Sequence, residues 1–165
     1  MILRCTQKLL KASGATAEPD PGVPVGVLGE WYANGVSLPF PGRSTVMFTH
    51  PGTLLTVVAP GRALRTTLPV FHQRLPGLLR RVGVPEEWIS AHAPAGEVRL
   101  AKTADRRVLG SMTDFAYAIW YHAQVVSGEM NIDELERELA ITPMSYLGHG
   151  SPDRAMLKLA TSEIP

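Results

Sequence analysis

Residues 31–60 read WYANGVSLPFPGRSTVMFTHPGTLLTVVAP, and Pro-Gly pairs divide this stretch, with the last pair at Pro60-Gly61. Proline presets φ for the second position of a turn and glycine accepts the positive φ of the third, so each pair is typical of a type II turn. The segments between the turns, 31–38, 45–50 and 54–59, are short and rich in β-branched or aromatic residues. The stretch predicts an antiparallel meander of three strands.

Outside this stretch the apolar pattern is mostly helical. One apolar stripe runs over residues 68–82, where Pro76 and Gly77 predict a kink or a break. The other expected elements are an opening strand at 2–6, a helix starting at 85, a strand at 97–103 and helices at 112–126, at 132–140 and from 151. Strands followed by helices indicate an α+β fold, so we expect an antiparallel meander with helices packed on one face.

The chain of 165 residues has the length of one domain, and we expect residues 1–165 to form a single core. Residues 12–28 are rich in Pro, Gly and Ala without periodicity. They predict a flexible loop that is too short to separate two domains.

Cysteine and hydropathy indicate a cytoplasmic protein. Cys5 is the only cysteine, which excludes an intramolecular disulfide and a cysteine-based zinc site. No segment approaches the roughly 20 apolar residues of a membrane span, and the start does not resemble a signal peptide. We therefore expect no membrane partner.

Charge is distributed unevenly although the formal net charge is only +1. Residues 31–85 contain no Asp or Glu but six arginines, and acidic residues gather near the C-terminus. The six arginines are Arg43, Arg62, Arg65, Arg74, Arg80 and Arg81, and the acidic residues are Glu129, Asp133, Glu134, Glu136 and Glu138. The fold either separates a basic from an acidic surface or joins the two groups in salt bridges.

The main candidate site is the strand-to-helix junction KTADRRVLGSMTDF at residues 102–115. A helix N-terminus offers unpaired N–H groups to an anion, and the side chains of Lys102, Arg106 and Arg107 add positive charge. Ser111 is the expected N-cap, with Asp114 at the spacing of a capping box. Helix capping with solvated basic residues is the alternative explanation, and Asp114 offsets part of the charge.

Further candidates for lining a cleft are aromatic, amide, acidic and imidazole side chains: Trp31, Tyr32, Asn34, Asp114, Tyr121, His122 and His149. Aromatic rings among cationic strands suit stacking on bases, but core packing is the more ordinary explanation for Trp31. His122 fits either a boundary residue of its helix or a general base. The histidines show no metal-ligand spacing and no phosphate-loop motif occurs, so we expect no metal and no cofactor.

Four stretches carry a resemblance that covers nearly the full length: LRCTQKLL at 3–10, WYAN at 31–34, the 102–115 junction and SPDR at 151–154. By these the chain resembles an uncharacterised, mostly bacterial family, a domain of unknown function. The resemblance implies a single intact domain in a bacterial cytoplasm. It implies no activity and no catalytic residues.

Three functions are compatible with these observations. The first is a binding module for nucleic acid or another phosphorylated partner, which uses the basic junction. The second is a small hydrolase or nuclease-like enzyme that uses His122 or His149 with Asp114. The third is an accessory or regulatory protein whose acidic C-terminal helix binds a protein partner. Whether the chain is an enzyme stays open.

Overall fold

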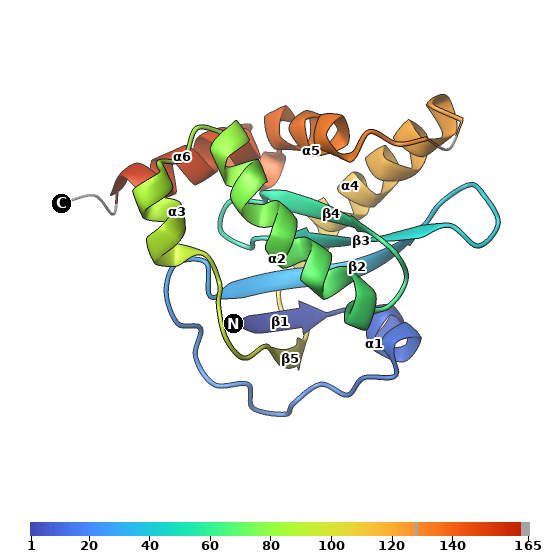
Figure 1. The fold of residues 1–165 in the computed structure, drawn as a ribbon, viewed down its shortest axis with the longest axis horizontal. Coiled ribbons are helices and arrows are strands. Elements are labelled where there is room, and N and C mark those ends of the chain that lie inside the picture. Colours follow the sequence, from blue (N-terminus) through green and yellow to red (C-terminus); the bar gives the residue numbers. More distant parts are fainter. Residues whose placement is uncertain (128, 163–165) are drawn as a thin grey trace.

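The computed structural model describes residues 1–127 and 129–162. In this part of the chain, five strands, six α-helices and one 3₁₀ turn follow one another (Figure 1). The elements are β1 (Ile2–Cys5), α1 (Gln7–Ser13), β2 (Glu30–Ser37), β3 (Ser44–Thr49), β4 (Thr56–Pro60), α2 (Leu64–Arg81), α3 (Glu86–His92), β5 (Arg99–Lys102), α4 (Arg106–Val125), α5 (Ile132–Ile141), η1 (Ser145–Leu147) and α6 (Pro152–Ser162).

The strands form one mixed sheet in the order β4-β3-β2-β1-β5. The neighbours β2, β3 and β4 are antiparallel, which confirms the predicted meander. However, β1 lies parallel to both β2 and β5, so the expectation of an antiparallel sheet alone was wrong. Parallel neighbours are joined by long crossovers, and a crossover leaves no local turn signal that would show where its strand pairs.

The Pro-Gly turns differ from one another. Gly42 has a φ of 73°, as the third position of a type II turn requires. After Pro51-Gly52 the left-handed residue is instead Leu54, with a φ of 58°, and β4 begins only at Thr56. This loop is therefore longer than the predicted tight turn.

Helices cover both faces of the sheet, so the expectation that they pack on one face was wrong. Side chains of α1, α2, α3 and α6 pack on the face that carries Trp31 and Phe48. Those of α4 and most of α5 pack on the face that carries Tyr32 and Met47. Residues 45–50 are all buried, and a continuous buried run is typical of a strand covered on both sides.

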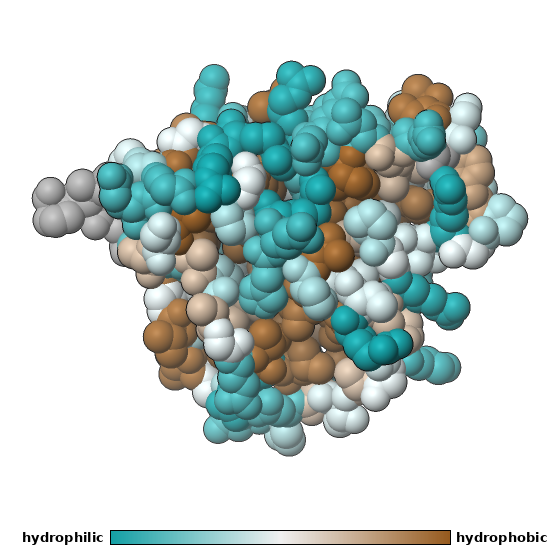
Figure 2. Space-filling model, in the orientation of Figure 1, coloured by the Kyte–Doolittle hydropathy of each residue, from teal (hydrophilic) through white to brown (hydrophobic). Residues whose placement is uncertain are grey.

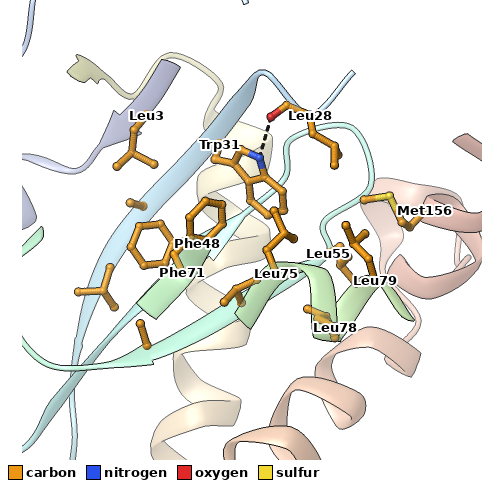
Figure 3. Close-up of a cluster of buried hydrophobic side chains, with 14 of the residues drawn as sticks. Leu3, Leu28, Trp31, Phe48, Leu55, Phe71, Leu75, Leu78, Leu79 and Met156 are labelled. Atoms are coloured by element: carbon orange, nitrogen blue, oxygen red, sulfur yellow. Dashed lines mark hydrogen bonds between the residues drawn. The ribbon is translucent and has the colours of Figure 1, made fainter. Parts of the chain in front are cut away.

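The larger core lies between the sheet and α2 (Figure 3). The ring of Phe71 on α2 lies 5.0 Å from that of Trp31 and 4.7 Å from that of Phe48, measured between centroids. Trp31 Nε1 donates to the Leu28 carbonyl at 3.0 Å, so the one polar atom of this side chain is satisfied. Because burying one such side chain contributes roughly 1.5–3 kcal/mol, these contacts fix α2 across the sheet.

α2 is one helix from Leu64 to Arg81, although Pro69 and Pro76 lie inside it. Of the two outcomes predicted at Pro76, a kink or a break, the break was therefore wrong. An interior proline costs a helix about 3 kcal/mol, because it removes an N–H donor and its ring meets a carbonyl. Phe71 and Leu75 lie between the two prolines and are buried, and this burial offsets the cost.

The segment between α1 and β2 has no helix or strand, as its composition predicts, but it is anchored to the sheet edge. The Glu18 N–H donates to the Leu100 carbonyl at 2.7 Å, and Arg99 Nε donates to the Glu18 carboxylate at 2.9 Å. The segment thereby covers part of the outer edge of β5, which would otherwise expose unpaired backbone groups.

Candidate anion-binding groove

The junction at residues 102–115 starts a helix earlier than the predicted Met112. α4 begins at Arg106, and Asp105 is its N-cap, because the Asp105 carboxylate accepts from the Arg107 N–H at 2.8 Å. Ser111 lies buried inside the helix, where its hydroxyl donates to the Arg107 carbonyl at 3.2 Å. Aspartate caps a helix as well as serine does, so the earlier cap starts the helix. The assignment of Ser111 as N-cap was wrong, and its hydroxyl is not available to an anion.

The three cations of the junction are exposed. The Arg107 guanidinium lies 3.7 Å from the Asp105 carboxylate and 5.4 Å from the centroid of the Tyr146 ring. Lys102 and Arg106 stand on the surface beside it. None of the three lines the groove that opens beside α1, and their role in anion binding stays a prediction.

The aromatic candidates at the start of β2 are packed inside the protein. Trp31 is fully buried, as the core-packing alternative holds, and Tyr32 is buried with its phenol oxygen accepting from the Asp105 N–H at 3.2 Å. The half-buried Asn34 accepts from the Thr6 hydroxyl at 2.9 Å. The structure therefore gives Trp31 and Tyr32 no open surface on which a base could stack.

The remaining candidates lie on α4 and on the loop before α6. Asp114 and Tyr121 are exposed, and His122 Nδ1 lies 3.2 Å from the Glu138 carboxylate of α5. Asp114 and His122 are eight positions apart in the helix, about 12 Å along the axis, so no proton passes directly between them. His149 is exposed in a left-handed conformation with a φ of 66°. The catalytic role of these residues stays a prediction.

The basic α2 and the acidic α5 are joined in what we call the α2–α5 latch: Arg74, Arg81, Asp133 and Glu136. The fully buried Glu136 carboxylate accepts from Arg74 Nη2 at 2.8 Å and Arg81 Nη2 at 2.6 Å. It also accepts from the Val58 N–H of the edge strand β4 at 3.0 Å. Asp133 accepts from Arg74 Nη2 at 2.6 Å. Two of the acidic residues that suggested a protein partner are thus occupied within the chain.

A groove of about 870 Å³ opens between α1, the hairpin that joins β2 to β3, and the turn before α2. Four basic residues line it: Lys8 and Lys11 from α1, Arg43 from the hairpin and Arg62 from the turn. Among the described residues that line the groove, none is acidic. Figure 2 shows hydrophilic side chains projecting at the right-hand edge, where these elements meet in Figure 1.

The groove is hollow because the residues beneath it are small. Along the outer half of the hairpin, the side that faces α1 carries Gly35, Ser37 and Ser44, since alternate strand residues share a face. A Cβ placed on Gly35 would lie 4.0 Å from Cδ1 of Leu9 on α1. Larger side chains at these positions would fill the space between hairpin and helix.

Hydrogen bonds join the walls of the groove to one another. The Ser44 hydroxyl donates to the Gly61 carbonyl at 3.2 Å, and the Gly61 N–H donates to the Ser44 carbonyl at 2.9 Å. The Leu64 N–H at the start of α2 donates to the Ser13 hydroxyl at the end of α1, at 3.0 Å. Contacts within the chain therefore hold the groove open.

The sequence signal for the groove was incomplete. The acid-free segment contains Arg43 and Arg62, but nothing in it separates these from arginines that pair with carboxylates. Lys8 and Lys11 are one helical turn apart, so they share a face of α1. Only the fold brings this face beside the hairpin.

The fold and the groove together define a class of protein, a three-layer α+β protein with a basic groove beside one hairpin of its sheet. The chain belongs to the family described as a domain of unknown function (DUF6933), whose model matches residues 2–155. This confirms the resemblance to a family of unknown function. No curated protein and no solved structure matches the chain.

Two further properties concern only residues 1–127 and 129–162. No helix there combines the length and the apolar character needed to cross a membrane. No three His, Cys, Asp or Glu side chains lie in an arrangement that could hold a metal ion.

Proposed function

We propose that the protein binds a phosphorylated ligand in the groove between α1 and the β2–β3 hairpin. The observation that carries this proposal is the set of four basic side chains around one preformed groove whose described lining contains no carboxylate. Within the described residues, no ion pair holds Lys8, Lys11 or Arg62. Lys8, Lys11 and Arg62 thus lie together without counter-charges among the described residues, and such a group of cations creates a positive potential that attracts anions.

The other lining residues indicate what the ligand carries besides its phosphate. The hairpin contributes Leu38, Pro39 and Phe40, which offer an apolar wall opposite the lysines of α1. The volume of the groove falls within the roughly 300–1,000 Å³ of small-molecule sites. A nucleotide, free or within a single strand, combines a phosphate with a planar ring that stacks on an aromatic side chain. This is the chemistry that the groove fits best.

The test is fluorescence anisotropy with a fluorescein-labelled oligothymidylate and with a fluorescent nucleoside triphosphate, each over a range of salt concentrations. We expect binding that weakens as salt rises, because bound cations release counterions from phosphates. In the variant Lys8→Glu/Lys11→Glu, affinity should fall at least tenfold. For the oligonucleotide, the slope of log affinity against log salt should fall by about 0.7 for each phosphate that the variant no longer neutralises.

Two further double variants change the net charge by the same amount. Arg154→Glu/Lys158→Glu alters exposed cations on α6 and controls for general charge effects. Lys102→Glu/Arg106→Glu tests the junction as the rival site. Loss of binding in the junction variant alone would place the binding site at the junction and contradict the proposal that it lies in the groove. An equal loss in all three variants, or no binding by the unmodified protein, would also overturn it.

A further inference from the structure

One face of α4 exposes large apolar side chains. Tyr117, Tyr121 and Val125 are 68%, 56% and 63% exposed, and they follow one another at intervals of four residues. Residues four apart lie on one side of a helix, so these three form a stripe. The opposite side of α4 packs into the core through Phe115 and Ile119. The stripe therefore needs an explanation other than folding of this chain.

The stripe has the composition of a protein interface. The Tyr117 ring stacks on that of Trp120 with centroids 6.4 Å apart, so part of the surface is already ordered. Tyrosine and tryptophan are enriched at interfaces because they bury a large area and lose little conformational entropy. Exposed apolar patches of this kind mark interaction sites on folded proteins.

Charge is distributed with opposite sign at the two ends of the stripe. Lys102 and Arg106 are exposed at the N-terminal end of α4. At the other end stand the exposed Glu129 and the Glu138 carboxylate, which is held 3.2 Å from Nδ1 of His122 near the end of the helix. A two-fold axis through the stripe would place the basic end of one protomer against the acidic end of its partner.

We propose that α4 is the interface of a homodimer, in which two copies of the helix pack antiparallel across a two-fold axis between Asp114 and Tyr117. A two-fold interface uses the same patch twice, so a patch that is basic at one end and acidic at the other complements itself. The charge pattern selects a second copy of this chain over an unrelated partner, which would need its own matching gradient.

The same axis explains a glycine inside α4. Gly110 is exposed, and a Cβ built there would meet no atom within 4 Å. Glycine in a helix interior costs roughly 0.5–1 kcal/mol relative to alanine. An axis between Asp114 and Tyr117 sets Gly110 opposite Tyr121 of the partner subunit, so the missing side chain leaves room for that ring. Asp114 then lies opposite the partner's Tyr117, whose hydroxyl can donate to the carboxylate.

Sedimentation equilibrium of the full chain tests the dimer. We expect a concentration-dependent dimer whose dissociation constant rises about 30-fold or more in Tyr121→Ala, the effect of removing a central aromatic anchor. The matched control is Val25→Ala, which shortens an exposed apolar side chain of the α1–β2 segment and should leave association unchanged. A strictly monomeric native protein, or a dimer that Tyr121→Ala leaves intact, would overturn the proposal.

One variant separates loss of the interface from loss of folding. Gly110→Gln should raise the melting temperature, because glutamine favours a helix more than glycine does, and should weaken the dimer by filling the space for the tyrosine. A dimer of unchanged or greater affinity in this variant would contradict the pairing of Gly110 with Tyr121.

A mixing experiment tests the pairing of the charged ends. Lys102→Glu and Glu129→Lys should each weaken the homodimer roughly tenfold at low salt, because each puts like charges at both ends of the interface. A mixture of the two restores opposite charges at both ends, so heterodimers should form with near-native affinity. Failure of the mixture to associate would overturn the antiparallel arrangement.

Discussion

The α2–α5 latch and the basic groove draw their arginines from the same acid-free segment, yet they place them in opposite surroundings. Arg74 and Arg81 meet a buried carboxylate, and Glu136 also takes the N–H of Val58 at the sheet edge. Arg62 lines the groove, where the described lining holds no acid. The difference teaches that the acid-free segment is not one functional surface. One part of it holds the fold together, and another part lines a groove whose described residues include no acid.

Removal of the Glu136 charge should give the largest loss of stability. It distinguishes the latch from the groove most clearly. Glu136→Gln leaves Arg74 and Arg81 without their buried partner, and breaking a buried pair costs about 3–5 kcal/mol. Urea unfolding measures the loss of stability. The matched control Glu134→Gln, exposed on the same helix, should change the free energy of unfolding little. Equal effects of the two substitutions would show that the latch does not stabilise the fold.

A second buried group, the imidazole of His50, makes the stability of the fold sensitive to acid. Burial lowers the pKa of His50 from 6.5 to about 4, although its hydrogen bond to the Val27 carbonyl opposes the shift. As the pH falls below 6.5, His50 becomes protonated in the unfolded chain, whereas in the native protein it stays neutral until about pH 4. Stability from this group is therefore complete above pH 6.5 and falls by about 3 kcal/mol as the pH drops to 4.

The variant His50→Gln checks this pH dependence. The slope of unfolding free energy against pH between 4 and 6.5 should decrease by the equivalent of one proton, whatever the substitution does to stability at neutral pH. Urea titrations at a series of pH values give the slope. An unchanged slope would show that His50 does not carry the acid sensitivity of the fold.

Substitutions in the junction should change stability less than those above. Unlike the groove, the junction contains an acidic residue, Asp105, whose role in stability can be tested. Asp105→Ala should destabilise the protein by about 1 kcal/mol, because it removes the N-cap of α4. Ser111→Ala should cost less, since its hydroxyl donates to a carbonyl already within the helix. Thermal unfolding compares the two. A greater loss in Ser111→Ala would contradict the position of the cap.

The groove lysines should give the smallest effect on stability. In Lys8→Glu/Lys11→Glu, both side chains are exposed and within the described residues make no ion pair, so unfolding should shift by no more than about 0.5 kcal/mol per substitution. The same variant should lose ligand binding. A large loss of stability would show that these lysines, like Arg74 and Arg81, belong to the fold.

The sequence predicts those structural elements that depend on residues close together in the chain. The β2–β3–β4 meander follows from turn and strand patterns, and α5 begins at Ile132 as predicted, with the Asn131 side chain accepting from the Glu134 N–H at 3.2 Å. The parallel pairing of β1 with β5 does not follow, because it joins residues far apart in the chain. The second layer of helices has a sequence signal in the consecutive apolar residues Val46, Met47 and Phe48, because a strand covered on one side alternates apolar with polar residues.

The candidate site was harder to predict than the fold. Local chemistry correctly marked residues 102–115 as a strand-to-helix junction, but it placed the cap at Ser111, because a serine before an apolar stripe and an aspartate before it give the same kind of signal. The groove depends on Lys8 of α1 and Arg62 of the turn before α2 lining the same space beside the hairpin, and on the small residues Gly35 and Ser44 leaving that space open. This arrangement is a property of tertiary packing.

The position of β1 also governs when the sheet can be completed. This strand is central in the parallel part of the sheet, and its partners are β2 and the much later β5, so that Ile2 pairs with both Glu30 and Arg99. During synthesis on the ribosome, β1 is made long before β5. One edge of β1 therefore stays without its partner strand until residue 102 has been synthesised. Pairings between distant residues slow folding. Pulsed hydrogen exchange during refolding should therefore show the amides of β1 and β5 gaining protection together, after those of the meander.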